Sequence, residues 1–302
     1  MDVATKDTQA IEDSLVDEDL ADGLQVTASA DREDQCGGSD AKLQRWRVEQ
    51  RELCTRLKLQ DDENPSGFEA WQHFGGVDIS FVKGTELACA SLVVLRAPLP
   101  DTPAKDLELV YEDFELVTMD EPYIAGFLAF REVKFLKTLW HRLEDRLARG
   151  EVDKTRVRMP DITLVDGNGV LHSRGFGLAS HLGVELGIRT IGVAKTLLQV
   201  DGMTKDRVAD WIDATPKAES GFTVTNLVGD SGRCWGSAVL ALSHLTKPIF
   251  ISCGHRVSLK TALNVVHRCC AFRIPEPVRQ ADLRSREWLR VNKPSPSSSS
   301  SS

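Results

Sequence analysis

The chain has 302 residues, 41% of them hydrophobic and 27% charged, which is an ordinary composition for a globular protein with one large domain or two small ones. Its net charge of −8 is concentrated at one end, because residues 1–40 hold 12 acidic and 2 basic groups and the other 262 residues hold 33 and 35. The body of the chain is therefore close to neutral. Local basic patches on it could meet a polyanion, which the acidic end would oppose.

The sequence also argues against a membrane protein and a secreted one. No run of about 18 apolar residues occurs, so no membrane span is expected, and the N-terminal residues lack the apolar core of a signal peptide. Seven cysteines at irregular positions, with no CxxC pair, predict an intracellular protein with reduced thiols.

Tails are predicted at both ends of the chain. Residues 1–40 are poor in aromatic residues, rich in aspartate and without a sustained period, so they are predicted to be disordered. Residues 292–302 are rich in serine, and no structure is expected there. The first predicted element is an amphipathic helix over residues 41–59, where apolar residues recur near helical spacing.

Strands come first in the body of the chain, and strands alternating with helices follow. The predicted strands cover residues 74–82, 86–96, 107–118, 161–165, 188–194, 223–228, 235–242 and 248–252. The predicted helices cover residues 127–149, 178–186, 204–213, 255–268 and 278–290. This order predicts one α/β domain over residues 41–291, with a mixed β-sheet flanked by helices.

Two aspartates lie in apolar segments, where burying a carboxylate costs free energy. Asp78 lies inside an apolar strand, and Asp166 ends another strand, just before a glycine-rich bend. A buried carboxylate needs a cation beside it, and open α/β sheets bind ligands at the carboxyl ends of their strands. Neighbouring strands lie ~4.8 Å apart, so the two aspartates could share a divalent ion, and oxygen ligands favour Mg²⁺ or Mn²⁺. The alternatives are a structural ion pair for Asp78 and an ordinary Asp-Gly turn for Asp166.

Other polar residues have a functional and a structural interpretation each. Glu132, near the start of the long helix, is either a solvated group near the helix dipole or a third acidic ligand turned toward the sheet. Lys195 ends a predicted strand and is either a surface lysine or a group that holds a phosphate or a developing oxyanion. His255, at the predicted start of a helix, is a candidate general acid/base or metal ligand, although most histidines at helix starts have neither role. His172 and Arg174 either contact a phosphate or are solvated.

Two loops complete the set of candidates. Tyr123, between Pro122 and Ile124, is either the edge of the core or a wedge that stacks on or separates bases. The glycine-rich bend that begins at Gly167 approaches a GxGxxG motif but lacks its third glycine. The next strand ends on Lys195 where a dinucleotide fold needs an acidic residue, so a nucleotide-cofactor oxidoreductase is not favoured.

These segments together resemble the endonuclease V family of inosine-specific nucleases. The matching motifs span about residues 75–265, in the family's order, and are GGVDISF, PYIAGFLAFREV, PDITLVDGNGVLHSRGFGLASHLG, GVAKTLL and GHRVSL. The resemblance implies an RNase H-like fold and a catalytic domain over residues 41–291. It assigns Asp78, Glu132 and Asp166 to the binding of Mg²⁺, for which Mn²⁺ would substitute. It makes Lys195 the catalytic lysine, with His255 nearby.

The resemblance also implies a site for an extruded base. Pro122, Tyr123 and Ile124 would form the wedge that fills the gap left by the base. The pocket for hypoxanthine would be built from Leu128, the backbone from Gly167 to Gly169, Gly177 and Leu178, with His172 beside it. Ala125 stands where the family's wedge often has a second proline, which weakens the expectation that duplex DNA is handled.

The activity implied by the resemblance is that of an endoribonuclease. It would cut single-stranded RNA at the second phosphodiester bond 3′ to inosine and leave a 5′-phosphate and a 3′-hydroxyl, with weaker activity on DNA containing deoxyinosine. A DNA-repair endonuclease and a non-catalytic reader of inosine in RNA are the alternatives. The protein is expected to be a monomer in the cytoplasm, with some presence in the nucleus or nucleolus.

Overall fold

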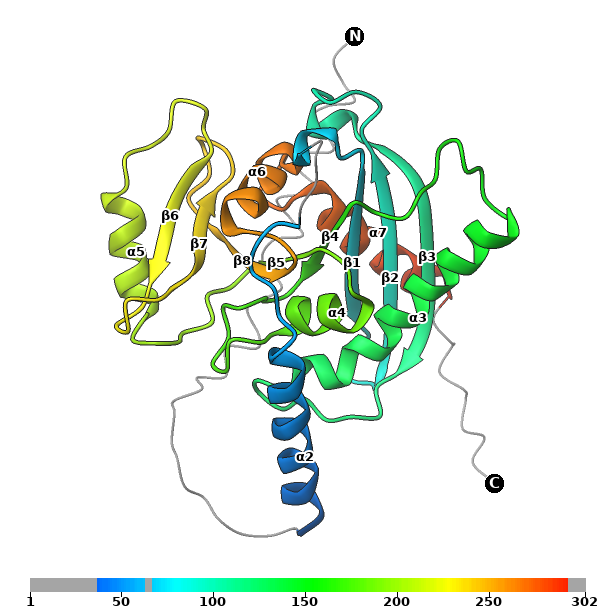
Figure 1. The fold of residues 1–302 in the computed structure, drawn as a ribbon, viewed down its shortest axis with the longest axis horizontal. Coiled ribbons are helices and arrows are strands. Elements are labelled where there is room, and N and C mark those ends of the chain that lie inside the picture. The colour runs from blue at the N-terminus through cyan, green and yellow to red at the C-terminus, as the bar shows by residue number, and fades with distance from the viewer. Residues whose placement is uncertain (1–36, 63–66, 293–302) are drawn as a thin grey trace. The chain divides into compact units, whose positions relative to one another are not determined.

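The computed structural model describes residues 37–62 and 67–292, and the fold outlined here is that of the unit from residue 43 onward, separate from the N-terminal unit 1–42 (Figure 1). Most of the two predicted tails lies outside the described residues. The helices are α2 (Gly37–Cys54), α3 (Leu128–Arg149), α4 (Leu178–Leu186), α5 (Lys205–Ala214), α6 (Leu259–Cys269) and α7 (Glu276–Asn292), with short 3-10 helices at Phe68–Ala70 and Ala104–Asp106. The strands are β1 (His73–Phe81), β2 (Leu87–Arg96), β3 (Glu108–Thr118), β4 (Ile162–Asp166), β5 (Thr190–Ala194), β6 (Thr223–Val228), β7 (Cys234–Leu240) and β8 (Ile249–His255).

The predicted mixed sheet is confirmed. Its eight strands lie in the order β3-β2-β1-β4-β5-β8-β7-β6. Strands β1, β4 and β5 run parallel to one another, and all other neighbouring pairs are antiparallel. The carboxyl ends of the three parallel strands therefore meet at one edge of the sheet, and the start of β8 lies at the same edge because Phe250 pairs with Ala194. This edge is called the catalytic edge below.

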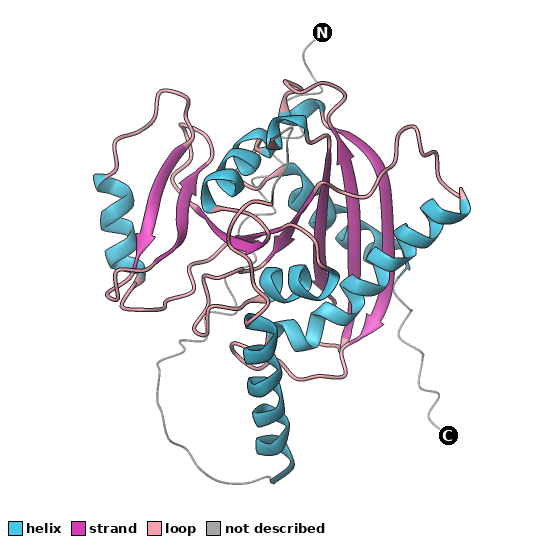
Figure 2. Cartoon of the chain, in the orientation of Figure 1, coloured by secondary structure: helices cyan, strands magenta, loops and turns pink. Residues whose placement is uncertain are grey.

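Helices cover both faces of the sheet (Figure 2). On one face, Val77 and Val165 pack with the apolar sides of α3 and α4. On the other face, Phe74 and Ile162 pack with α6 and the start of α7. Side chains alternate between the faces along a strand, so a residue that follows Val77 or Val165 points toward α7. No helix in the described part of the chain is long and apolar enough to cross a membrane.

The largest departures from the predicted boundaries are at the two ends of α2 and at the junction of β8 with α6. Helix α2 ends at Cys54, earlier than residue 59, and the described helix already begins at Gly37. Strand β8 extends to His255, which pairs with Thr190 of β5, and α6 begins only at Leu259. Ser258 caps α6 by accepting a hydrogen bond from the Thr261 N–H, which is the role serine favours at this position. The prediction that His255 begins the helix is therefore wrong.

Candidate active site

Two of the predicted metal ligands meet at the catalytic edge. Val77 lies opposite Val165 in the β1–β4 pair, so Asp78 and Asp166 follow on adjacent strands. Asp78 is only 8% exposed, and its carboxylate accepts hydrogen bonds from Ser80 at 3.1 Å and from Ser285 of α7 at 3.3 Å. Burial, together with the charges of Asp166 and Asp282, raises the pKa of Asp78 well above its usual value.

Glu132 comes to the same place from α3. Its side chain is turned inward, with 5% of the residue exposed, so the interpretation as a solvated helix residue is wrong. Burial and the charge of Asp166 raise the pKa of Glu132 to about 8, against the opposite influence of Arg131. The structure therefore places two buried carboxylates, Asp78 and Glu132, within electrostatic reach of Asp166, whose charge raises the pKa of each.

Lys195 lies between two of the acidic groups. Its ammonium is 2.9 Å from Asp166 and 2.9 Å from Asp282, a residue of α7. Burial alone would lower the pKa of Lys195, but Asp166 and Asp282 outweigh it and raise that pKa. The lysine is thus a charged member of the cluster and not a surface side chain.

Asp282 was not among the residues predicted from the sequence. It lies in a polar helix, and only the packing of α7 across β1 and β2 brings it to the catalytic edge. A signal was present all the same. The buried residues of α7 include Val278, Ala281 and Ser285, and Asp282 stands at helical spacing from Val278 on the same side.

The acidic cluster has the chemistry of a site for a hard divalent cation. Asp78, Glu132, Asp166 and Asp282 offer only oxygen atoms, which suits Mg²⁺ or Mn²⁺. Their mutual repulsion is the electrostatic reason why a further cation would be bound.

A different group of side chains is the tightest cluster of possible ligands in the described chain. Atoms of Glu49, His181 and Glu185 lie within 4.8 Å of one another. The Lys137 ammonium lies 2.9 Å from Glu185, and hydrogen bonding to His181 and Lys137 lowers the pKa of Glu185 to about 2. Because this carboxylate already has a counter-ion, we interpret the group as an ion-pair network between α2, α3 and α4.

The glycine-rich bend after Asp166 packs tightly against its surroundings. A Cβ on Gly169 would lie 2.0 Å from the Cys253 carbonyl oxygen, so this glycine permits contact with β8. The Gly169 N–H donates to Ser252 at 2.9 Å, and its carbonyl accepts from the Gly177 N–H at 2.9 Å. The side-chain oxygen of Asn168, by contrast, is buried without a hydrogen-bond partner among the described residues.

The predicted wedge is an exposed loop with an anchored base. Tyr123 is 67% exposed, and Pro122 beside it is exposed as well. Where the loop rejoins the fold, the Gly126 carbonyl accepts a hydrogen bond from the guanidinium of Arg174, which lies 4.1 Å from the Phe127 ring. Tyr123 is therefore not the edge of the core, and the Arg174 contact fixes the base of its loop.

His172 lies beneath this loop as a buried, neutral side chain. Its Nδ1 accepts a hydrogen bond from the Arg174 N–H at 3.2 Å, and 6% of the residue is exposed. Leu178, the first residue of α4, borders the same bend, and Leu128 is the first residue of α3. A Cβ on Gly167 would lie 3.4 Å from the Leu178 side chain, so the bend and the start of α4 are in contact.

His255 lies elsewhere, which corrects the expectation that it sits near the metal ligands. It pairs with Thr190 at the start of β5, at the edge opposite to Lys195. Its Nδ1 accepts a hydrogen bond from the Lys58 N–H at 3.2 Å. The structure thus gives His255 a role in joining the segment after α2 to the sheet.

Acid is expected to destabilise the fold through His172 and His255. Burial and Arg174 lower the pKa of His172 to about 4, and burial, Arg256 and Lys58 lower that of His255 to about 4. An unfolded histidine titrates near 6.5, so between about pH 6.5 and 4 the unfolded chain binds protons that the folded chain does not. The free energy of unfolding therefore falls as the pH drops through this window.

Denaturant unfolding at pH 7.0, 5.5 and 4.5 measures this loss. His255→Asn is the matched variant, because its amide oxygen can accept the Lys58 N–H in place of Nδ1. In this variant, the slope of the free energy of unfolding against pH should be smaller by at most about 1.4 kcal/mol per pH unit, which is the largest contribution one histidine can make. An unchanged slope in the variant would show that His255 does not stay neutral in the folded state.

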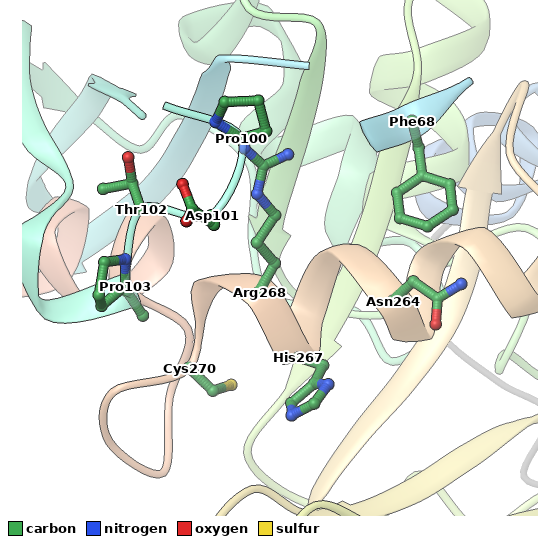
Figure 3. Close-up of a pocket in the computed structure, with 10 residues that line it drawn as sticks. Phe68, Pro100, Asp101, Thr102, Pro103, Asn264, His267, Arg268 and Cys270 are labelled. Carbon is green, nitrogen blue, oxygen red and sulfur yellow. The ribbon is translucent and has the colours of Figure 1, made fainter. Parts of the chain in front are cut away.

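A cavity of about 430 Å³ lies away from the cluster, between the loop after β2 and helix α6 (Figure 3). Arg268 extends from α6 toward Pro100, and His267 and Asp101 are also among the lining residues. None of the residues predicted for catalysis or base binding lines it. The candidate active site is therefore the acidic cluster and not this cavity.

Comparison with known proteins agrees with the motifs. The model of the family Endonuclease V matches residues 51–283, which is most of the described chain. The chain belongs to the endonuclease V family. Membership in this family indicates a nuclease, and hence a hydrolase.

Individual members support the same assignment. Endonuclease V from mouse (Mus musculus) is 47% identical over 253 residues, which are 82% of this chain and 70% of the mouse protein. The crystal structure of the catalytic domain of human endonuclease V matches with 43% identity and a TM-score of 0.73, over 83% of this chain and 97% of that one.

The crystal structure of endonuclease V from Ciona intestinalis, in complex with a DNA that contains an inosine followed by a ribo-adenosine, matches with 32% identity and a TM-score of 0.72. The match covers 83% of this chain and 99% of that chain. The RNase H-like fold expected from the sequence is confirmed by these endonuclease V structures.

Proposed function

We propose that this member of the endonuclease V family is a divalent-metal-dependent endoribonuclease that cuts inosine-containing single-stranded RNA at the second phosphodiester bond 3′ to inosine, leaving a 5′-phosphate and a 3′-hydroxyl. The observation that carries the proposal is the meeting of Asp78, Asp166 and Asp282 with Lys195 at one edge of the sheet, with Glu132 close enough to Asp166 for that charge to raise the pKa of Glu132. DNA containing deoxyinosine is the weaker substrate in this proposal.

The acidic cluster would hold Mg²⁺, with Mn²⁺ able to replace it. When bound, the metal would activate a water and stabilise the charge that develops on the leaving 3′ oxygen. Lys195 is positively charged beside Asp166 and Asp282, and its ammonium would neutralise a non-bridging oxygen of the scissile phosphate. The ammonium and the carboxylates together would orient the phosphate for attack.

The bend after Asp166 would distinguish inosine from adenosine. Inosine offers an N1–H donor where adenosine has an acceptor, so a site for inosine needs a hydrogen-bond acceptor facing that edge. The buried side-chain oxygen of Asn168 is such an acceptor and has no partner among the described residues. Binding of inosine would satisfy it, whereas adenosine would leave two acceptors facing each other.

The exposed loop would hold the base out of the strand. Tyr123 is free to stack in the gap that an extruded base leaves, while Arg174 and Gly126 keep the start of the loop in place. The relative from Ciona binds a strand with a ribose directly after the inosine, which is consistent with an RNA substrate. A purely DNA-directed repair enzyme and a non-catalytic reader are the competing functions, and the intact acidic cluster opposes the latter.

The test compares single-stranded RNAs that differ only at one nucleotide. Inosine RNA should be cut in Mg²⁺ and not in EDTA, and the matched adenosine RNA should be cut at least about a hundredfold more slowly, in line with the discrimination that unpaired polar groups provide. The same sequence as deoxyinosine DNA should be the slower substrate. Binding without cleavage in any divalent ion would establish a reader, and faster cleavage of DNA would establish a repair enzyme.

A further inference from the structure

Four arginines from three separate segments gather beside the exposed loop that carries Tyr123. They are Arg47 and Arg51 of α2, Arg174 of the segment between β4 and α4, and Arg233 of the turn between β6 and β7. All four are exposed, and none of them forms an ion pair in the described part of the chain. Together they are called the arginine face below.

Helix α2 carries its charges on two different flanks. Its buried stripe includes Trp46 and Gln50, and Arg47 and Arg51, one turn apart, project from one flank of that stripe. The opposite flank carries Glu49, which faces α4. No acidic residue stands three or four positions from either arginine, so their charges are not compensated within the helix.

The other two arginines come to the same flank of α2. Burial and the nearby charge of Arg47 lower the pKa of Arg174. Burial raises the pKa of the Cys54 thiol at the end of α2, and the charge of Arg233 opposes this rise, so Arg233 lies near that end. A Cβ on Gly175 would lie 3.4 Å from the Arg233 guanidinium, which therefore also adjoins the residue after Arg174. Like charges gathered in this way favour a polyanionic partner.

The arginine face is fixed beside the proposed base site. Gln50 of α2 donates hydrogen bonds to the carbonyl oxygens of Phe176 at 2.8 Å and of Gly126 at 3.4 Å, and it accepts one from Arg174. Phe176 directly precedes Gly177 of the proposed hypoxanthine pocket, and Gly126 ends the exposed loop. Helix α2 is thus attached to both parts of the site that would hold an extruded base.

We propose that the arginine face binds phosphate groups of the substrate RNA strand other than the scissile phosphate. The inference rests on the proposed function, which supplies the substrate, and it adds a place where the strand is held outside the acidic cluster. Guanidinium groups bind phosphate oxygens through two parallel hydrogen bonds. Contacts to phosphates position a strand and carry no sequence information. The arginine face would therefore hold any RNA strand, and the base site would select inosine.

The first experiment removes charge from one flank of α2. Arg47→Gln with Arg51→Gln is compared with Arg45→Gln with Arg56→Gln, two exposed arginines that also lack ion pairs in the described residues and lie outside the arginine face. Binding is measured in EDTA. At about 0.1 M salt the first variant should bind inosine RNA about twentyfold more weakly, with a slope of log K against log salt smaller by about 1.4, or about 0.7 per lost contact. The control should stay within about twofold of wild type.

Three results of this experiment would overturn the arginine face. Equal losses in both double variants would mean a general charge effect. A loss for inosine RNA without the same loss for adenosine RNA would mean that Arg47 and Arg51 act through the base pocket and not on phosphates. Adding Arg233→Gln should reduce the slope by a further amount of about 0.7, and an unchanged slope would contradict the shared surface. Melting temperatures should stay within about 2 °C of wild type, because all these side chains are exposed.

The second experiment removes charge from the RNA. One phosphate at a time on either side of inosine, apart from the scissile one, is replaced by an uncharged methylphosphonate on a 2′-O-methyl nucleotide. At least one replacement should weaken binding to the wild type about fivefold and have no effect on the variant that lacks Arg47 and Arg51, since that contact is already lost. If every replacement acts equally on both proteins, these arginines do not contact phosphates.

The two proposals fail in different experiments. If wild-type protein does not cut inosine RNA in Mg²⁺ or Mn²⁺, the proposed function fails, whatever the strength of RNA binding. If it cuts inosine RNA but the variant that lacks Arg47 and Arg51 binds RNA with the affinity and salt slope of the wild type, the arginine face fails and the function stands.

Discussion

Replacing Asp78 by asparagine is expected to abolish cleavage and at the same time to make the protein more stable. Asp78 is buried beside Asp166 and Asp282, and burial together with these charges raises its pKa well above the usual value. Asparagine keeps an oxygen that can accept from Ser80 and Ser285, and it removes one negative charge from the cluster. The folded state thus loses a repulsion that the unfolded state does not have.

The expected magnitudes follow from this picture. Cleavage of inosine RNA should fall at least about a thousandfold, which corresponds to about 4 kcal/mol in the barrier. The melting temperature in EDTA should rise by about 2–6 °C, as expected for a gain of about 1–2 kcal/mol in a chain of this size. The rise in melting temperature should be smaller in Mg²⁺, because a bound cation then neutralises the acidic cluster of the wild-type protein.

Asp113→Asn is the matched control. Asp113 is also a buried aspartate of the sheet, but Arg142 lies 3.1 Å from it and Arg146 lies 3.8 Å from it. Removing this charge should leave Arg146 without its carboxylate partner and Arg142 with Glu115 alone, lower the melting temperature and spare cleavage. Undiminished cleavage by Asp78→Asn would refute its role in metal binding. If Asp78→Asn lowered the melting temperature as much as Asp113→Asn does, the acidic cluster would not be destabilised by charge repulsion in the folded state.

The sequence predicts those residues of the site whose position is set by the strand that carries them. Asp78 lies inside an apolar strand and Asp166 ends another, so a shared ion was one interpretation of the two aspartates, and the parallel pairing of β1 and β4 brings them to adjacent strands. The mixed sheet was predictable for the same reason, since apolar runs of about five residues between turns define the strands almost independently of the rest of the fold.

The parts that were missed depend on contacts between distant segments. Asp282 reaches the cluster only because α7 packs across β1 and β2, and a polar helix gives little sign of which strands it will cover. His255 was misplaced because a strand that continues into a turn and a helix that begins there have similar local sequences. Pairing with Thr190, which lies 65 positions earlier, decides between them. Local sequence carries no information about such pairings.

Replacing Lys195 by methionine is also expected to abolish cleavage, but with the opposite effect on stability. The ammonium lies 2.9 Å from both Asp166 and Asp282, so its removal leaves two carboxylates facing each other without the cation between them. Breaking a buried pair on one side is costly, and since Lys195 is 31% exposed we expect a loss of about 1–3 kcal/mol, below the value for fully buried pairs. Methionine keeps the apolar stem of the side chain, so packing is largely preserved.

The cause of this loss can be separated from a packing defect. Mg²⁺ should stabilise Lys195→Met more than the wild type, because the added cation replaces the missing charge. Adding Asp282→Asn should recover most of the lost melting temperature in EDTA, since one of the two opposed charges disappears, and should leave cleavage absent. If the second substitution lowers stability further, Lys195 contributes through packing and not as the counter-ion. If the single variant still cleaves within about tenfold of wild type, the lysine does not act on the phosphate, and neutralisation of the scissile group must come from the metal ions alone.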